Sequence, residues 1–439
     1  MSINTLKNSA GLRLFIIGAL SLILLIPAFM IQALITEREQ RRDSAVSEVS
    51  DKWGGKQVLA GPILTVPYKN PVKDDKGNLV SVIEHAHFLP EHLAITAELY
   101  PEIRYRGIYE VILYNAKLQV QGDFTPPDFN NFNILPENIL WKDAFLSLGL
   151  SDLKGIRDIV KFKWNGEELV ANAGIESKEV LGVGISVKPV LTASAGSHSF
   201  GVALDLNGSS AISFVPVGKE TKVTISSKWG NPSFVGEYLP NDRQVRHDQF
   251  NAEWKILHLN RNYPQQWLGS QHKIMDSAFG VKLLLPIDEY QKTMRTAKYA
   301  IMFIALTFLA FFLTEILNKK IIHPIQYILI GLALILFYTL LLSFSEHVRF
   351  NFAYLISSTA IIALITAYTK SVLSNNLATV IIAGILIVLY GFLYIILQLQ
   401  DYALLLGSIG LFVILAIVMY ITRNIDWFAI GKPTVEQAK

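Results

Sequence analysis

The 439-residue chain has 51% hydrophobic and only 17% charged residues, and 60 of its 75 charged residues lie between positions 36 and 295. The other two fifths of the chain is too apolar, in runs too long for core helices, to belong to one water-soluble globule, and the same composition excludes intrinsic disorder. The lack of cysteine excludes disulfides and thiolate metal ligands, and the net charge of +3 is too small to indicate nucleic-acid binding.

The first apolar segment is long enough to cross a membrane. Residues 14–36 contain no charged side chain, and at about 1.5 Å per residue they exceed a hydrocarbon core of roughly 30 Å. A cleaved signal peptide is the alternative, because Lys7 and Arg13 precede the segment as a basic region. The apolar run is longer than that of a signal peptide and no A-x-A site follows it, so we predict a retained transmembrane helix.

Five further apolar segments follow the charged region, which predicts six transmembrane helices. They are residues 299–317, 325–345, 350–369, 377–398 and 402–422. The connections between them are short, as is typical of an up-and-down bundle. We therefore divide the chain into an N-terminal transmembrane helix (1–35), an inserted domain (36–295) and a five-helix transmembrane bundle with a short cytoplasmic tail (296–439).

Lysines and arginines in the short loops predict that both chain ends are cytoplasmic and that the insert is extracytoplasmic. In this orientation Arg349 is the only basic residue in a short outer loop, whereas eight lie on the inner side: Lys7, Arg13, Lys319, Lys320, Lys370, Arg423, Lys432 and Lys439. Five basic residues near the outer ends of the first two spans oppose it: Arg38, Arg41, Arg42, Lys292 and Arg295. Large translocated domains count little in this rule, so we keep the orientation; in a bacterium the insert would be periplasmic.

The insert begins with a helix and continues as a β-rich domain. Residues 36–53 carry mixed charge and continue the first span, and Gly54 and Gly55 are suited to end the helix. Apolar and polar residues then alternate, as in strands with one wet and one dry face, in residues 114–121, 199–206 and 222–226. We predict an antiparallel domain of two packed sheets.

Turn and helix-start signals complete the insert. Asn165-Gly166 and Asn207-Gly208 each fit a two-residue hairpin, and residues 75–78 fit a longer loop. Pro286 and Asp288 predict the start of a second helix that leads into the membrane. Helices at both ends of the insert indicate a domain held close to the membrane surface.

Five long stretches are specific enough to indicate a family. They are GLRLFIIGALSLILLIPAFMIQALITER, SSKWGNPSFVGEYLPNDRQV, FNAEWKILHLNRNYPQQW, FGVKLLLPIDEYQKTMRTAKYAIMFIALTF and HPIQYILIGLALILFYTLLLSFSEH. Together they resemble the bacterial inner membrane protein CreD family, over essentially the whole chain. The resemblance implies an inner-membrane protein with a periplasmic domain, linked to envelope integrity and tolerance of a colicin, and often controlled by a sensor kinase and response regulator that also affect β-lactam responses. It brings no catalytic residues, because the family's molecular activity is not established.

Histidines are densest at His85 and His87, with His92 close by. On a strand His85 and His87 face the same way, and a carboxylate beside them could complete three ligands of the kind that zinc accepts. The alternative is a solvated strand end before the turn at Pro90, which we favour because spacing does not by itself make a site. We predict no metal and no cofactor.

Two membrane-associated groups also suggest chemistry. Ser343 to His347 combine hydroxyl, carboxylate and imidazole groups, but such close neighbours seldom reach the geometry of a catalytic triad, and no G-x-S-x-G or H-E-x-x-H motif occurs. We interpret them as a polar interfacial loop. Glu315, the one acidic residue inside a span, lies four residues before Lys319 on the same helical face, so we interpret the two as a snorkelling ion pair.

Six aromatic residues within forty positions are candidates for binding a partner: Trp229, Phe234, Tyr238, Trp254, Tyr263 and Trp267. Tryptophan and tyrosine are enriched in binding hot spots, although aromatic residues of a sheet more often lie in its core. The sequence does not indicate the oligomeric state.

Three functions remain open. The first is a non-enzymatic envelope protein whose β domain binds an envelope protein or a lipid. The second is a transporter or flippase, which requires a mid-membrane cavity with polar residues such as Tyr338, Thr339, Ser358 or Tyr390. The third is a hydrolase, for which Ser345 and His347 are the best residues. We favour the first, because no catalytic set accompanies a large insert tied to the membrane at both ends.

Overall fold

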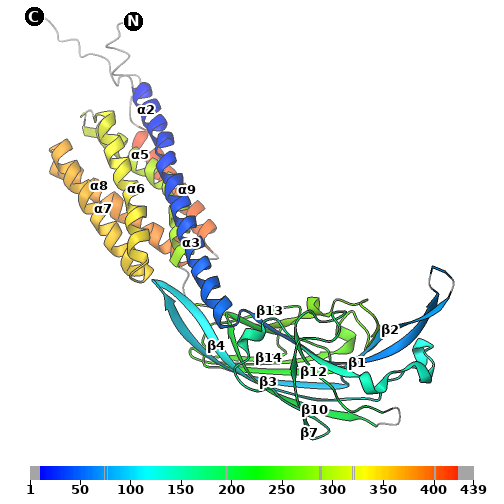
Figure 1. The fold of residues 1–439 in the computed structure, drawn as a ribbon. Coiled ribbons are helices and arrows are strands. Elements are labelled where there is room, and N and C mark those ends of the chain that lie inside the picture. Colours follow the sequence, from blue (N-terminus) through cyan, green and yellow to red (C-terminus); the bar gives the residue numbers. More distant parts are fainter. Residues whose placement is uncertain are drawn as a thin grey trace, which may run out of the picture. The chain divides into compact units, whose positions relative to one another are not determined.

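The computed structural model describes residues 10–73, 75–76, 78–192, 196–285, 289–318, 320, 322–399 and 402–423 (Figure 1). Contacts divide the chain into two units, a β-rich unit at Arg42–Pro286 and a helical unit that combines Met1–Arg41 with Ile287–Lys439. The insert predicted at residues 36–295 is longer at both ends, because it includes parts of the flanking helices that pack within the helical unit.

The helical unit contains six helices that are long and apolar enough to cross a membrane, within the part of the chain that is described. The first of them is formed by α2 and α3, which are separated only at Leu24, and a short polar helix, α4, precedes the second. The helices are α2 (Ala10–Ile23), α3 (Leu25–Trp53), α4 (Glu289–Lys298), α5 (Ala300–Asn318), α6 (Pro324–Ser345), α7 (Phe350–Leu373), α8 (Asn376–Gln398) and α9 (Ala403–Thr422). The predicted multi-pass helical architecture is confirmed.

Local sequence fixes several of these helix ends. The ring of His323 accepts a hydrogen bond from the first turn of α6, where Pro324 needs no amide partner. Ser374, with φ of 48°, ends α7 in the left-handed conformation. The side chain of Asn375 then accepts two amide hydrogen bonds at the start of α8.

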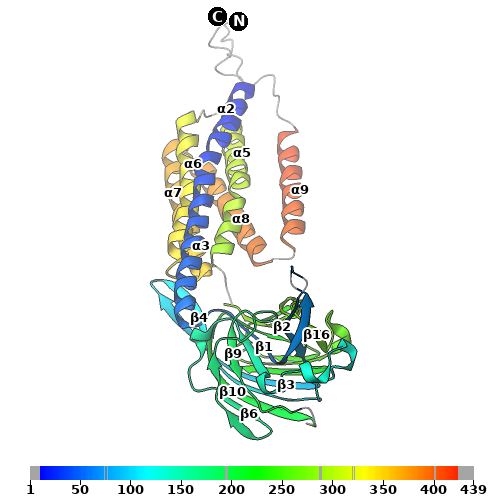
Figure 2. The same cartoon turned by 45° about the vertical axis from the view of Figure 1, so that its right-hand side comes forward.

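The first span packs within the bundle and α9 lies at its periphery. α2 contacts both α5 and α6. Gly331 of α6 permits this approach, because a Cβ there would lie 2.2 Å from Leu24 and 3.0 Å from Phe308. Ala403 is the only described residue of α9 that is buried, and the helix stands to one side in Figure 2.

The β-rich unit is built from two packed sheets (Figures 1 and 2). One has the order β13-β17-β11-β1-β5-β9-β8 with β2 beside β1 and β16 beside β2, and the other, the eight-stranded sheet, has the order β14-β15-β12-β3-β4-β10-β6-β7. The strands are β1 (Gln57–Lys73), β2 (Leu79–Phe88), β3 (His92–Arg106), β4 (Tyr109–Phe124), β5 (Phe145–Leu150), β6 (Lys161–Trp164), β7 (Glu167–Leu169), β8 (Asn172–Ala173), β9 (Gly184–Val187), β10 (His198–Ser209), β11 (Ala211–Val215), β12 (Glu220–Ser227), β13 (Pro232–Gly236), β14 (Asp242–Val245), β15 (Phe250–Leu257), β16 (Gln266–Leu268) and β17 (Phe279–Leu283).

Most neighbouring strands are antiparallel, as predicted, but two pairs are parallel. β1 pairs with β11 and β3 pairs with β12 in this way. Parallel strands need a long connection, because the chain must return to the same end of the sheet before the second strand begins. The partners in both pairs are far enough apart in the chain to allow this. The predicted alternation is confirmed in β4, β10 and β12, whose apolar residues are buried between the sheets.

The two predicted hairpins have different outcomes. Asn165 and Gly166, with φ of 49° and 87°, link β6 to β7 as predicted. Gly208 lies inside β10 instead, and the turn follows at Ser210, with φ of 59°. A Cβ at Gly208 would lie 2.2 Å from the hydroxyl of Tyr114, so this glycine serves close packing.

The predicted ends of the insert are partly described. Gly54 ends α3 with φ of 124° and donates its amide to the carbonyl of Ser50, as predicted. Gly77 of the predicted loop, and Pro286 and Asp288 of the predicted helix start, lie outside the described residues.

Candidate functional site

One face of the eight-stranded sheet is exposed and polar. Register across β12, β3, β4 and β10 places the exposed Lys222, Ala94 and Gln121 and the half-buried Gly201 side by side. We call this surface the open face; it consists of His92, Ala94, Thr96, Glu98, Lys117, Gln119, Gln121, Lys163, Ser199, Gly201, Ala203, Glu220, Lys222, Thr224 and Ser226. Small, hydroxyl and amide side chains predominate, so the face offers many hydrogen-bonding groups.

Two hollows lie along the open face. The larger, of about 600 Å³, is lined by His92, Gln121, Asp123, Lys163, Ser199 and Lys222 among others. The smaller, of about 320 Å³, is lined by Glu98, Tyr100, Ser226, Arg246 and Asn251 among others. They belong to one surface, because Glu98 and Ser226 continue the exposed alternation of β3 and β12.

Charges of both signs are paired on the open face. Lys222 and Lys255 approach Glu220 at 3.0 and 3.5 Å, and the hydrogen bond and charge of Lys222 are the main reason that the pKa of the Glu220 carboxyl is lowered. The ring of His92 lies 3.0 Å from the carboxylate of Asp123. Exposed ion pairs contribute little to stability, so these groups are free to reorient toward a polar ligand.

Three of the six aromatic candidates lie in the core of the β-rich unit. Trp254, Tyr263 and Trp267 are buried and therefore unavailable to a partner. They are buried because the two sheets and the segments between them pack around their rings. Trp229, Phe234 and Tyr238 are half-buried at the margin of the same core, and these three remain predicted contacts.

His85 and His87 face the same way on β2, as expected, and Glu179 lies against both. Its two oxygens are each 2.9 Å from a ring nitrogen, one of His85 and one of His87, and Thr65 lies 3.0 Å from the other nitrogen of His87. The expectation of a solvated strand end is wrong for His87, which is 1% exposed because Glu179 and Trp267 pack against it. We call His85, Glu179 and His87 the His–Glu clamp.

The His–Glu clamp is a hydrogen-bonded structure. His92 is not part of it, since it lies on β3 in the open face. Within the described residues, no group of three or more His, Cys, Asp or Glu side chains is arranged to hold a metal ion. The clamp instead fixes the irregular segment that carries Glu179 onto β2.

Acidification is expected to loosen the His–Glu clamp. Burial lowers the pKa of His87 despite the opposing effect of Glu179, and the pKa of Glu179 is also lowered because hydrogen bonds and charge from the two histidines outweigh its burial. A group with a lowered folded-state pKa stabilises the fold above its unfolded pKa and loses that effect as pH falls. Stability from the clamp should therefore decline from about pH 6.5 for His87 and further below about pH 4.3 for Glu179.

Hydrogen exchange provides the measurement. We expect amides of residues 174–183 to exchange faster at about pH 5.5 than at about pH 7.5 after correction for intrinsic rates, while core amides of β4 do not change. Glu179→Gln should raise exchange in the same segment already at the higher pH. Equal protection of this segment at both pH values in the unmodified protein would contradict the expectation.

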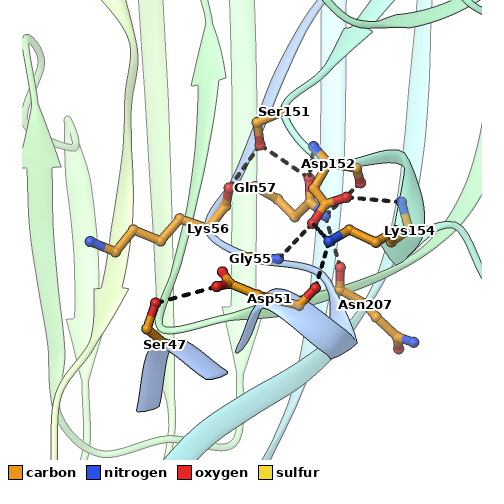
Figure 3. A network of polar contacts seen from close by, with 9 residues as sticks. All are labelled: Ser47, Asp51, Gly55, Lys56, Gln57, Ser151, Asp152, Lys154 and Asn207. Atoms are coloured by element: carbon orange, nitrogen blue, oxygen red, sulfur yellow. Dashed lines mark hydrogen bonds and ion pairs between the residues drawn. The ribbon is translucent and has the colours of Figure 1, made fainter. Parts of the chain in front are cut away.

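A second buried polar group fixes the end of α3 to the β-rich unit (Figure 3). Gln57 is 1% exposed and uses its whole amide. Its Nε2 donates to the carbonyls of Asp152 and Asn207 at 3.0 and 3.1 Å, and its Oε1 accepts from the Ser151 hydroxyl and the Asp152 amide at 3.2 and 3.3 Å. We call these four residues the Gln57 network; it joins β1 to β10, and thus one sheet to the other.

The same region contacts α3 directly. Lys154 donates to the carbonyl of Asp51 in α3 at 2.6 Å, and the amide of Gly55 donates to the Asp152 carboxylate at 3.3 Å (Figure 3). Gly155 allows the close approach, because a Cβ there would lie 2.3 Å from the Asn207 carbonyl. The only sequence signal for this arrangement is the row of small and polar residues that follows α3.

Glu315 in α5 is buried, at 3% exposure, and pairs with the first span. Arg13 of α2 lies 2.9 Å from one carboxylate oxygen, and the hydroxyl of Tyr327 in α6 donates to the other at 3.0 Å. The predicted partner, Lys319, lies outside the described residues. The contacts of Glu315 with Arg13 and Tyr327 join three helices, through partners that local spacing cannot indicate.

Glu346, directly after α6, contacts both helices that flank the insert. It accepts a hydrogen bond from Tyr290 of α4 at 3.0 Å and lies 3.9 Å from Arg38 of α3. Its neighbours do not form a triad: Ser345 donates to a backbone carbonyl of the preceding turn, and the His347 ring lies 3.1 Å from another. These contacts fit the predicted polar interfacial loop.

Six membrane-spanning candidates around one large β-rich insert define a multi-pass helical membrane protein. The chain belongs to the CreD family: the family model described as inner membrane protein CreD matches residues 9–428. It is 33% identical over 424 residues to the inner membrane protein CreD of Escherichia coli (strain K12), which covers 95% of this chain and 94% of that relative. The resemblance found in the sequence is thereby confirmed, and with it the assignment to the inner membrane.

Solved structures offer only remote likenesses. The M1 zinc metallopeptidase from Deinococcus radiodurans has a TM-score of 0.20 and 10% identity, covering 44% of this chain and 42% of that chain. A mutant of the same peptidase has a TM-score of 0.20 and 10% identity, covering 38% of each chain. The chain therefore spans less than half the length of these proteins, and similarity this weak says nothing of its activity.

Proposed function

We propose that this inner membrane protein supports the integrity of the cell envelope without catalysing a reaction. Its insert faces the periplasm, both chain ends lie in the cytoplasm, and the open face binds an envelope component or a protein partner. The observation that carries the proposal is the open face itself, a polar surface that extends over several strands of the eight-stranded sheet.

The character of the open face favours binding. Sites for small molecules are concave and mostly apolar, with a few convergent polar groups. The open face has small and polar side chains in rows, and its two hollows are lined by charged and amide groups. Such a surface suits a broad polar partner, while the half-buried Trp229, Phe234 and Tyr238 remain candidates for an apolar contact at the margin of the domain.

The positions of the candidate catalytic groups support a role without catalysis. Ser345 and His347 are bonded to helix backbone, and Glu346 is engaged by Tyr290 and Arg38. A nucleophile requires a base within hydrogen-bond reach, and these three side chains are directed to other partners. Function that survives Ser345→Ala and His347→Ala would agree with the proposal.

Blocking the open face should abolish function without unfolding the protein. Gly201 and Ala203 lie on β10, between β4 and β6 of the open face, and a Cβ at Gly201 would meet nothing within 4 Å. We expect Gly201→Arg with Ala203→Arg to fail to restore the envelope of a strain that lacks the gene. The measurement is complementation at equal protein level in the membrane.

Matched variants make this test specific. Gly182, which also has open space at its Cβ, lies before β9 in the other sheet, so Gly182→Arg should complement fully. A chain with residues 36–295 replaced by a short linker should fail like the open-face variant. Full complementation by either the linker chain or the open-face variant would overturn the proposed role of the insert.

A transporter or flippase is the second candidate, because polar side chains do lie beside a hollow at membrane depth. Ser358 and Tyr390 line a hollow of about 540 Å³ between α7 and α8. Tyr338 is buried inside the bundle and Thr339 is half-buried. Complementation by the linker chain, together with its loss on Ser358→Leu, would favour transport over partner binding.

A further inference from the structure

The hollow between α7 and α8 has polar side chains at one end and in its middle, and isoleucines at the other end. Asn351 and Tyr394 line the first end together with the apolar Phe352 and Leu355, Ser358 and Thr359 line the middle, and Ile362 and Ile387 line the far end. The polar end lies where α7 begins and α8 ends, which chain connectivity places on the same side of the membrane as the insert. We call this hollow the α7–α8 groove.

The groove has the length of one membrane leaflet. From Asn351 to Ile362 the helix advances about 16 Å, at about 1.5 Å per residue, and half of a hydrocarbon core of roughly 30 Å is nearly the same. Its volume of about 540 Å³ lies within the range of about 300–1,000 Å³ found for ligand sites. A single molecule with one polar and one apolar end matches both the length and the gradient.

The wall behind the groove is rigid. The hydroxyl of Tyr354 donates to the carbonyl of Tyr390 at 2.6 Å and so ties α7 to α8. The ring of Phe337 in α6 packs against both, with ring centres 5.5 and 4.8 Å away. Because Tyr354 and Tyr390 are held in this way, the groove exists before any ligand arrives, which reduces the entropic cost of binding.

Gly391 makes the hollow without being required for helix packing. A Cβ at this position would meet nothing within 4 Å, in contrast to Gly410 of α9, where Phe392 fills the space at 2.2 Å. Polar groups that face hydrocarbon are unfavourable unless they find partners. The hydroxyl of Ser358 already donates to the carbonyl of Leu355 at 3.1 Å, so it is the hydroxyl groups of Thr359 and Tyr394 beside this empty space that point to a ligand with polar atoms near its headgroup end.

We propose that the α7–α8 groove binds one phospholipid molecule from the leaflet on the insert's side of the membrane. Its headgroup and ester groups lie at Asn351 and Tyr394, and an acyl chain extends between Ile362 and Ile387. A transmembrane helix of a second copy is a poorer fit, since helix association uses small residues along a whole interface and this hollow ends at mid-membrane. The proposal is independent of what the open face binds.

Photocrosslinking tests the proposal with the full-length protein in phosphatidylethanolamine vesicles that contain a trace of phospholipid with a diazirine in its acyl chain. We expect crosslinked lipid to concentrate on residues 351–362 and 387–394. Gly391→Phe, which fills the groove, should reduce labelling there by about tenfold, equivalent to about 1.4 kcal/mol of lost affinity. Gly407→Phe is the matched control, because its Cβ also has open space but it does not line the groove.

Each outcome bears on the proposal. Labelling spread evenly over the lipid-facing sides of α7, α8 and α9, or unchanged by Gly391→Phe, would overturn it, as would crosslinks that join two copies of the chain at the groove. If Gly391→Phe fails to fold, Thr359→Phe closes the groove from α7 and must give the same loss. Labelling retained in a folded Thr359→Phe protein would equally overturn the proposal.

Discussion

Replacing Glu315 by glutamine is expected to destabilise the helical unit by about 1–3 kcal/mol, because it leaves a guanidinium that is 21% exposed without its carboxylate. Arg13 would lose its partner in α5, while Tyr327 could still donate to the new amide. Arg13 lies at the end of the first span, so the loss is that of its ion pair and not the full penalty of a charge at the centre of the membrane. The measurement is the fraction of monodisperse full-length protein after heating in detergent micelles.

A double variant separates charge from packing. Arg13→Gln with Glu315→Gln replaces the ion pair by two neutral amides, so it should recover most of the stability lost by Glu315→Gln. Lys370→Gln, at an exposed position near the end of α7, should behave like the unmodified protein. If Glu315→Gln proves as stable as the unmodified chain, the contact between Arg13 and Glu315 does not hold the first span in the bundle.

The sequence predicts those features that are set by residues close together in the chain. Long uncharged runs predict the membrane helices to within a few residues of their observed bounds, and alternation predicts three strands, β4, β10 and β12, but not the bounds of the others. Asn165-Gly166 was correctly assigned because a two-residue hairpin depends only on its own backbone angles. The helix caps at His323 and Asn375 are equally local.

Features that depend on contact across the fold could not be predicted. The pair Asn207-Gly208 is typical of a turn, but the lack of a side chain at Gly208 instead makes room for Tyr114 from a neighbouring strand. Glu315 has a lysine four residues away, yet its partner comes from the other end of the chain. The open face left no signal beyond alternation, because exposed polar residues on a strand look alike whether or not they bind a partner.

The aromatic candidates also depend on contacts across the fold: residues predicted to be accessible to a partner are buried in the core. Trp254 and Trp267 were singled out as large side chains that often form binding hot spots, and both are buried. Whether an aromatic residue of a strand faces the core or the solvent depends on where the second sheet lies, which short-range patterns do not specify. The polar residues that alternate with apolar ones in β3, β4, β10 and β12 are the better guide to an accessible surface.

Replacing Gln57 by leucine is expected to loosen the attachment of α3 to the β-rich unit. Leucine has a similar size but makes none of the four hydrogen bonds, so the Asn207 carbonyl loses this donor and the Asp152 carbonyl keeps only the amide of Gly155 at 3.3 Å. Each buried polar group left without a partner is unfavourable by about 1–3 kcal/mol. At about 2–4 °C per kcal/mol for a domain of this size, the melting temperature of the insert should fall by roughly 5–15 °C.

Proteolysis and a matched variant test this expectation in the full-length protein. Residues 54–56, which join α3 to β1, should become sensitive to protease well below the melting temperature, because Asp152 and Ser151 of the Gln57 network bond the backbone of Gly55 and Lys56. Gln119→Leu removes a glutamine of the open face, where water replaces its hydrogen bonds, and should leave protease sensitivity unchanged. Equal sensitivity of the two variants would mean that α3 is held by its helix contacts and that the buried amide contributes nothing specific.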